Sequence, residues 1–326
     1  MSTHITTHNV EKLNCSNENI SYIQIQPTMT LQKPFLKWVG GKSQIIKQVL
    51  GTIPKRMNNY HEFFLGGGSV LFAVLSLQKS GDLIIEGKIH AYDYNKALIA
   101  LYNNVKNHRE TLYDTIHKYK TVFNSLQGSE INRKPKSLEE AKTSKESYYY
   151  WIRKSYNESE DKTSVQASAL FMLLNKLCFR GLYREGPNGF NVPYGHYKNP
   201  NIITKESLYE MSDLIRNVIF KQSHFEDSFQ SLEKSDYVYC DPPYVPENKN
   251  SFVGYNSDGF TEKEHRSLFE KLIEHEKKGI RFSLSNSKVP MVEEYFQKNY
   301  QCEEVVARRA INSKNPEAKT MEVIYF

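Results

Sequence analysis

The stretch Tyr60-His61-Glu62-Phe63-Phe64-Leu65-Gly66-Gly67-Gly68-Ser69 decides the fold class of this chain of 326 residues. Residues 60–64 predict a short strand, and the apolar run from Val70 to Lys79 predicts a helix directly after it. Glycines at such a junction let the backbone approach a ligand closely, and the following helix N-terminus favours a negative group. The stretch therefore predicts a strand–loop–helix unit of an α/β sheet, with a binding loop.

The same alternation continues on both sides of a middle segment. Residues 84–92 predict a second strand that ends in Asp93, followed by a helix over residues 95–106. Later strands are expected at residues 219–222, 237–241, 280–284, 301–307 and 320–326. This rhythm is typical of a single α/β domain.

The middle segment interrupts that domain and differs from it in structure and charge. Helices are expected over residues 110–126, 138–154 and 165–177, and residues 178–200 predict a hairpin with a turn at 187–189. Residues 106–205 hold 17 basic and 10 acidic side chains, against 43 and 37 in the whole chain. This basic excess favours a polyanionic partner, although a solvated helical surface would give the same count.

These patterns predict the domain organisation and exclude several classes of protein. The α/β domain is expected at residues 31–106 and 205–326, the insert at 107–204, and a flexible polar tail at 1–30. The four cysteines are scattered without a metal-ligand spacing, so neither a structural zinc site nor a disulfide framework is expected. Without an apolar run of membrane length or a secretory segment, we expect a soluble, cytoplasmic protein.

A second informative stretch is Asp241-Pro242-Pro243-Tyr244, which follows the strand expected at 237–241. The prolines end the strand and lack N–H donors, so the strand tip presents a carboxylate, two unpaired carbonyls and an aromatic face. This set suits a flat substrate with an exocyclic amino group. The structural alternative is a proline-rich turn that merely closes the strand. The polar residues 245–259 that follow are a candidate lid.

Other positions carry weaker signals on their own. Asp93 stands where an acidic residue binds ribose hydroxyls in doubly wound folds. Gly40-Gly41-Lys42-Ser43 is not a phosphate-binding P-loop, because Leu36 stands where that motif needs its first glycine; Ser43 instead predicts a helix cap. The arginines and tyrosines of residues 180–197 suit a DNA duplex, or else pair with carboxylates of the same protein.

In this order, the motifs resemble those of the Dam-type adenine-N6 DNA methyltransferases, of the alpha group, over about residues 34–326. The matching segments are residues 35–42, 64–70, 93–95, 175–184, 190–195, 241–244 and 285–287. The resemblance implies a Rossmann-like methyltransferase sheet, with an inserted, mostly helical DNA-recognition domain that carries a β-hairpin. It also implies a restriction–modification, bacterial, phage or viral context. The oligomeric state stays open, and a monomer or a weak dimer would both be compatible with the sequence.

The resemblance further implies S-adenosylmethionine as methyl donor, double-stranded DNA as partner, base flipping and no metal. Catalysis is expected from Asp241, Pro242 and Tyr244. Cofactor binding is expected from Trp38, Lys42, Phe64, Gly66, Gly68, Asp93, Phe225 and Asp241. DNA binding is expected from Arg180, Leu182, Arg184, Pro193 and Tyr197.

Two questions stay open at the level of the sequence. A four-base site such as GATC or CATG is expected. Relatives that read GATC usually carry Asn where this chain has Arg180, so the choice between GATC and another site such as CATG stays open. Related proline–proline–tyrosine tips also serve methyltransferases that act on RNA or on protein glutamine, and a DNA-binding relative without catalysis is a further alternative. The basic insert favours DNA, and the intact Lys42, Asp93 and Asp241 favour an enzyme.

Overall fold

A computed structural model describes residues 20–24, 26, 29–246, 260–308 and 319–326. Its centre is a seven-stranded sheet in the order β10-β11-β9-β8-β2-β4-β7. All neighbouring strands are parallel except where β11 pairs with β9 and β10. The strands are β2 (Tyr60–Phe63), β4 (Ile89–Asp93), β7 (Val218–Gln222), β8 (Tyr237–Cys240), β9 (Arg281–Ser287), β10 (Cys302–Arg308) and β11 (Lys319–Tyr325).

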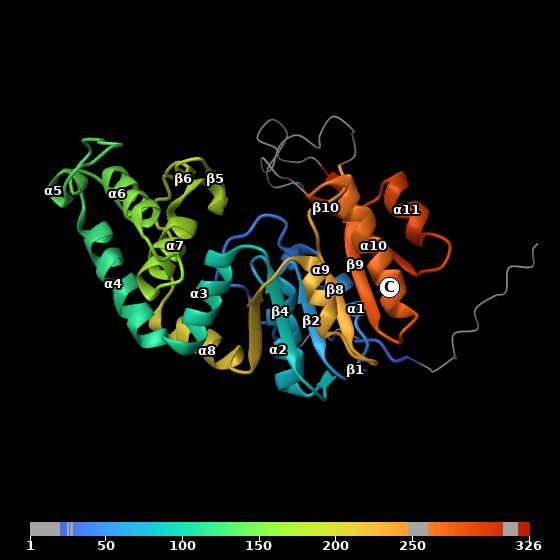
Figure 1. Cartoon of the computed structure of the whole chain (residues 1–326). Helices are drawn as coiled ribbons and strands as arrows, with labels where there is room; N and C mark the ends of the chain where they lie inside the picture. Colours follow the sequence, from blue (N-terminus) through green and yellow to red (C-terminus); the bar gives the residue numbers. More distant parts are fainter. Residues whose placement is uncertain (1–19, 25, 27–28, 247–259, 309–318) are drawn as a thin grey trace, which may run out of the picture.

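Helices cover both faces of this sheet (Figure 1). One face carries α1 (Ile46–Gly51), α2 (Ser69–Ser80) and α3 (Lys96–Asn107), and the other carries α9 (Phe225–Ser228), α10 (Glu262–Glu276) and α11 (Pro290–Phe296). The helices change face because the chain builds the sheet first toward β7 and then, from β8, toward the other edge, and parallel crossovers are as a rule right-handed. The central strands β2 and β8 are accordingly buried along their whole length.

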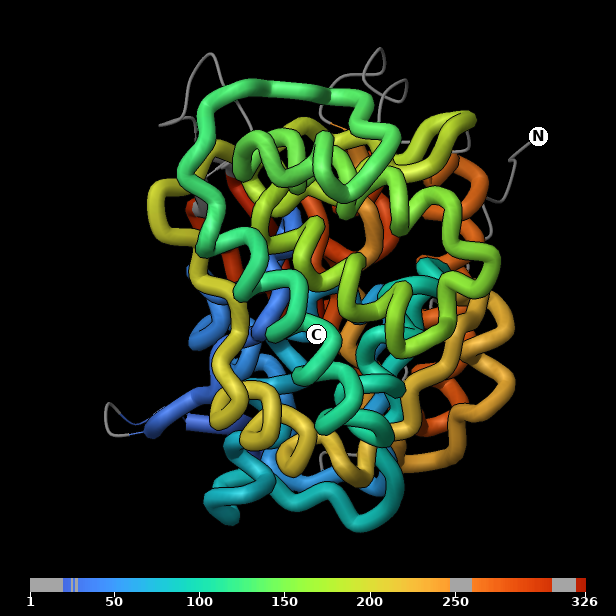
Figure 2. The backbone as a smooth tube through the Cα atoms, turned by 90° about the vertical axis from the view of Figure 1, so that its left-hand side faces the viewer, coloured from blue at the N-terminus to red at the C-terminus, as the bar shows by residue number. Residues whose placement is uncertain are grey.

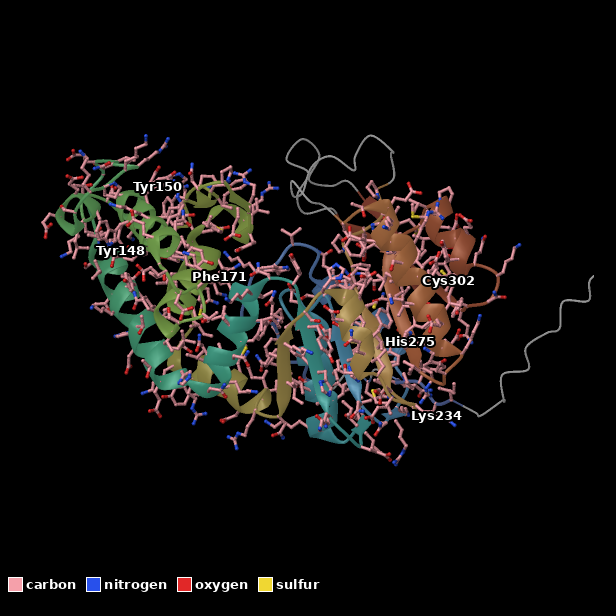
Figure 3. All side chains as sticks on the ribbon, viewed as in Figure 1. Tyr148, Tyr150, Phe171, Lys234, His275 and Cys302 are labelled. Carbon is pink, nitrogen blue, oxygen red and sulfur yellow. The ribbon has the colours of Figure 1, made fainter. Side chains whose placement is uncertain are left out.

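The insert forms a group of helices beside the sheet. It contains α4 (Arg109–Ser125), α5 (Leu138–Ala141), α6 (Lys145–Glu158), α7 (Val165–Leu177), and the hairpin of β5 (Glu185–Gly186) and β6 (Gly189–Phe190), with α8 (Lys205–Leu214) after it. The helices of the insert lie in front of the sheet in Figure 2. Tyr148 and Phe171, labelled in Figure 3, belong to an apolar core that runs without a break into the core on the α1–α3 face. The insert is therefore packed onto the sheet domain.

The predicted α/β sheet, helical insert and hairpin are confirmed, with three local differences. The strand expected at 84–92 is two strands: β3 (Ile84–Ile85) pairs with β1 (Arg56–Met57) in a separate small sheet, and only β4 joins the main one. The helix expected at 138–154 is divided, because Ser144 accepts the N–H of Ser147 and starts α6 anew. Ser43 does not cap a helix; it lies inside a 3₁₀ turn, Lys42–Gln44.

The flexible tail expected at residues 1–30 is wrong for Ser21 to Ile23. The Ile23 N–H donates to the Ile53 carbonyl at 3.0 Å, and the Ser21 carbonyl accepts the Lys55 N–H at 2.8 Å. Ile23 is buried, and the Tyr22 ring meets the edge of Phe326 at 5.5 Å. This short stretch is therefore part of the folded domain, while residues 1–19 lie outside the described residues.

Candidate active site

The candidate site lies where β2 and β8 run side by side in the centre of the sheet. The chain leaves β2 toward β4 and β8 toward β9, so the two strands mark the point at which the direction of winding reverses. In open α/β sheets, ligands bind beyond the carboxyl ends of the strands at such a point. The register pairs Phe63 with Cys240, which brings the glycine loop and Asp241 next to each other.

Lys42 and Asp241 form a buried ion pair at this place. Lys42 Nζ lies 2.7 Å from Asp241 Oδ1 and also donates to the Gly40 carbonyl at 2.8 Å; the exposed fractions of the two side chains are 4% and 19%. Burial raises the pKa of Asp241 to about 6, although Lys42 acts in the opposite direction; the nearby charge of Glu322 raises this pKa further. Asp241 is thus a carboxylate whose ionisation depends on Lys42.

Tyr244 is held between these charges and the neighbouring strand β11. Its ring lies beneath Lys42 Nζ, 4.8 Å from the ring centroid, and its hydroxyl donates to Glu322 Oε2 at 2.8 Å. The next residue, Val245, donates its N–H to Asn286 Oδ1 at 3.0 Å. The tetrapeptide is therefore fixed from two strands, while residues 247–259 of the expected lid lie outside the described residues.

The glycine loop is tied to the tip of β4 by Asp93. Asp93 Oδ2 accepts the Gly66 N–H at 2.9 Å, and Oδ1 accepts the Asn95 N–H at 2.8 Å. Burial raises the pKa of Asp93, and these two N–H donors oppose that rise. Gly66 and Gly68 have positive φ angles of 51° and 69°, a conformation that favours glycine. The loop thus keeps its turn because glycine allows it and Asp93 anchors it.

Aromatic rings line one side of the loop. The Phe64 ring stacks on Phe225 with centroids 6.0 Å apart, and Phe260 meets the two rings at 5.6 Å and 5.3 Å. Phe225 begins α9 beyond β7, which places it at the same edge of the sheet as Phe64. No local sequence pattern indicates that Phe64 and Phe225 are in contact, because they lie far apart in the chain.

Trp38 covers the other side of the loop and contacts the insert. A Cβ atom at Gly66 would lie 2.8 Å from Trp38 Cδ1, so the indole leaves no space for a side chain there. The same indole stacks on Tyr183, at 5.7 Å, and on Phe171 of α7, at 6.5 Å. Trp38 thus links the glycine loop with the inserted helices.

Glu62 is a buried carboxyl group that the sequence analysis did not single out. It lies in β2, is 2% exposed, and accepts the Tyr60 hydroxyl at 2.7 Å. Burial raises the pKa of Glu62 to about 8; the Tyr60 hydrogen bond lowers it and the charge of Asp241 raises it. The Glu62 carboxyl group of the folded protein is therefore mainly protonated, and neutral, at pH 7. An acidic residue within a strand expected in the sheet was the available signal.

Replacing Glu62 by Gln is expected to make the protein less sensitive to rising pH. The unfolded carboxyl releases its proton near its ordinary pKa of 4.5, while the folded one holds it up to about 8. The wild type therefore loses stability between these two values, on the order of a few kcal/mol, and Gln does not. Urea unfolding of both proteins at pH 5 and pH 8 measures this difference. An equal loss in the two proteins would contradict the assignment.

Comparison with known proteins agrees with this geometry. Residues 38–311 match the D12 class N6 adenine-specific DNA methyltransferases. The chain belongs to this family. It is 36% identical over 298 residues to the type II methyltransferase M.MjaIII of Methanocaldococcus jannaschii. The aligned region covers 88% of this chain and 95% of that protein. The DNA adenine methylase of Escherichia coli K12 is 28% identical over 296 residues, 90% of this chain and 94% of that protein.

A further relative of this D12-class methyltransferase is the type II methyltransferase M1.LlaDCHI of Lactococcus lactis, 32% identical over 299 residues, 90% of this chain and 94% of that protein. The resemblance to adenine-N6 DNA methyltransferases, and with it the expected enzyme class, is confirmed.

Within the described ranges, no group of three His, Cys, Asp or Glu side chains is placed to hold a metal ion. None of the helices described is long and apolar enough to cross a membrane.

The candidate DNA-binding residues of this D12-class enzyme lie around the hairpin of the insert. Arg184 is exposed, and its Nε donates to Asn191 Oδ1 at 2.6 Å across the hairpin. Arg180 is also exposed, has a positive φ of 56°, and lies over the Phe179 ring. Both guanidinium groups are on the surface of the insert, and Figure 1 shows the hairpin on the side of the insert nearest the sheet.

The other three positions are packed against the protein to different degrees. The Pro193 carbonyl accepts the Phe179 N–H at 2.8 Å, while its ring is exposed. The Leu182 side chain packs partly into the core. The Tyr197 ring lies under Lys37 Nζ at 3.8 Å. All five residues lie in or beside the hairpin region of the insert, and Arg180, Arg184 and Pro193 are the exposed members of the set.

Proposed function

We propose that this protein transfers the methyl group of S-adenosylmethionine to N6 of an adenine that is turned out of duplex DNA, within a short site such as GATC or CATG. The observation that carries the proposal is the buried Lys42–Asp241 pair beneath the carboxyl edge of the sheet, with Tyr244 against it. The family supplies adenine and DNA as the substrate class.

The residues around the glycine loop fit the proposed methyl donor. Phe64 and Phe225 offer aromatic surfaces for its adenine, and Asp93 keeps carboxylate lone pairs free for ribose hydroxyls beside the two N–H bonds it accepts. Gly66 and Gly68 let the main chain approach closely, and Trp38 and Lys42 flank the loop. When bound, the cofactor supplies an electrophilic methyl group on a sulfonium.

The chain's own contribution is to aim a weak nucleophile. The lone pair of adenine N6 is delocalised into the ring, so hydrogen bonds from its two N–H groups to Asp241 and the Pro242 carbonyl would favour a pyramidal nitrogen. Lys42 occupies Asp241 Oδ1, which leaves Oδ2 for the substrate. After the transfer, the nitrogen carries one proton too many, and an Asp241 carboxylate with a pKa of about 6 is suited to take it. This is catalysis by positioning and electrostatics.

The position of Asp241 supports base flipping. The carboxyl group is 19% exposed at the edge of the sheet, so a base stacked in a duplex cannot reach it. Extrusion costs a few kcal/mol, and stacking on an aromatic ring returns about 1–3 kcal/mol. Tyr244 supplies such a ring beside the carboxylate.

Mapping N6-methyladenine in DNA from cells that express this chain tests the whole proposal, because one experiment reports activity, base and sequence. Cells that express an empty vector provide the control. The expected result is methylation confined to one short motif, and purified enzyme should methylate duplex DNA in preference to RNA of the same sequence. Methylated RNA with unmodified DNA would overturn the proposal.

Arg184→Ala is expected to change where methylation occurs more than how tightly DNA is held. A surface guanidinium on the hairpin suits bidentate contact with guanine, and losing such a contact costs about 1–3 kcal/mol of discrimination. Methylation rates on the preferred site and on its single-base variants, beside DNA affinity, measure the effect. Lys134→Ala, an exposed cation elsewhere on the insert, is the matched control. A uniform fall in affinity with unchanged site preference would make Arg184 a phosphate contact instead.

A further inference from the structure

The segment directly after Asp241 lies beyond the strand ladder and contains two prolines. The β8–β9 ladder ends with the pairing of Cys240 and Leu284. Beyond it, Pro242 and Pro243 have no N–H groups to donate, so this part of the segment cannot be tied to β9 by its own main-chain donors. The proposed reaction nevertheless depends on where the Pro242 carbonyl points.

Asn286 of β9 supplies a fixed point just past this gap. Its Oδ1 accepts the Val245 N–H at 3.0 Å and also its neighbour Ser287's N–H at 2.9 Å. The side chain is fully buried, so these hydrogen bonds form away from water and hold their geometry. Its Nδ2 atom is buried without a hydrogen-bond partner in the part of the chain that the structure describes. The oxygen of the amide is therefore the atom that binds the main chain.

Both ends of the catalytic segment are thus held by the sheet. The strand ladder fixes Cys240 before it, and Asn286 fixes Val245 after it, with Val245 itself buried. Only four residues, Asp241 to Tyr244, span the two fixed points, and the two prolines in the middle have restricted φ angles. A short span with stiff residues and two fixed ends has few available conformations.

We propose that Asn286 is a positioning residue for methyl transfer, which acts by holding the Val245 N–H and thereby fixing the Pro242 carbonyl and the Tyr244 ring. The inference rests on the proposed function for its catalytic consequence, and on the Val245 contact alone for its structural one. Among the described residues, the hydrogen bonds of the Asn286 side chain go to Val245 and Ser287, and neither of these is a proposed catalytic or cofactor-binding residue.

Asn286→Leu is the sharpest test, because leucine has a similar volume and no acceptor. We expect single-turnover methyl transfer to fall by roughly 100-fold, as for a misplacement of about 1 Å, with dissociation constants for cofactor and DNA changed less than about threefold. Asn286→Asp keeps an acceptor oxygen at the same place and is expected to recover most of the rate. Asn286→Ala gives the same comparison with a smaller side chain if the leucine variant does not fold.

Ser285→Ala is the matched control. Ser285 is the preceding residue of the same strand and is equally buried, but its hydroxyl bonds Tyr239 at 2.9 Å on the opposite face. We expect a similar loss of stability with near-normal methyl transfer. An equal fall in rate for Ser285→Ala, or no recovery in Asn286→Asp, would overturn the positioning role.

Hydrogen exchange at the Val245 amide separates this inference from the proposed function. Exchange should accelerate in Asn286→Leu and stay slow in Asn286→Asp and Ser285→Ala, whether or not the protein methylates DNA. If the wild type does not methylate DNA, the proposed function fails while this comparison still decides the contact. Unchanged exchange in a folded Asn286→Leu protein would overturn the inference.

Discussion

Asp241→Ala is expected to abolish methyl transfer, lowering kcat by about 10³-fold or more, because it removes a preorganised acceptor for the adenine amino group. It also removes the only carboxylate that forms an ion pair with Lys42 in the described residues, so the surroundings of the Lys42 ammonium group change as well. Incorporation of labelled methyl groups into duplex DNA under single-turnover conditions measures the loss. Near-normal turnover in this variant would exclude the proposed mechanism.

A control must separate lost chemistry from lost folding, since the variant leaves Lys42 buried without its partner. Thermal unfolding and far-ultraviolet circular dichroism should show a folded protein, with a lower unfolding temperature. Asp114→Ala, an exposed aspartate of α4, removes a carboxylate of the same kind far from the site and should retain full activity.

Lys42→Met is expected to move the acidic limb of the pH–rate profile to higher pH. In the wild type, burial raises the pKa of Asp241 to about 6; Lys42 limits this rise, and the charge of Glu322 adds to it. Without the ammonium group, burial and the charge of Glu322 still raise the pKa of Asp241, and the lowering effect of Lys42 is gone. The Asp241 carboxylate, which accepts the hydrogen bond from N6–H, therefore forms at higher pH. Activity at pH 7 should fall by about tenfold or more, and part of it should return near pH 9.

Methyl-transfer rates at closely spaced pH values between 5 and 9 test this expectation. Lys47→Met, which removes an exposed cation from α1, serves as the control and should keep the wild-type profile. If Lys42→Met lowers the rate equally at every pH, the limb does not report Asp241, and the role of Lys42 is confined to binding.

The sequence predicted those features that depend on local patterns. Each of the relevant patterns lies within about ten residues: the apolar strands, the glycines after β2 and the prolines after β8. The fold class and the position of Asp241-Pro242-Pro243-Tyr244 at a strand end were therefore predictable. Features that depend on register were not. Glu322 reaches Tyr244 only because β11 lies antiparallel beside β9, and Asn286 reaches Val245 only because β9 lies beside β8.

In the insert, too, local features were predictable from the sequence and long-range contacts were not. Its helices and hairpin were predictable from spacing and turn residues, and the chain's basic excess lies there. The contact of Tyr197 with Lys37 was not, because it joins the end of the insert to a residue 160 positions earlier. No sequence pattern indicates such a contact.

The position of Trp38 gives this enzyme a built-in optical reporter. The chain has two tryptophans, and the other, Trp151, lies on α6. Indole emission depends on nearby polar groups and rings, and the Trp38 indole lies against Gly66 on one side and Tyr183 on the other. In a Trp151→Phe background, a single fluorophore would follow occupancy of the glycine loop and movement of the insert without any label, in real time.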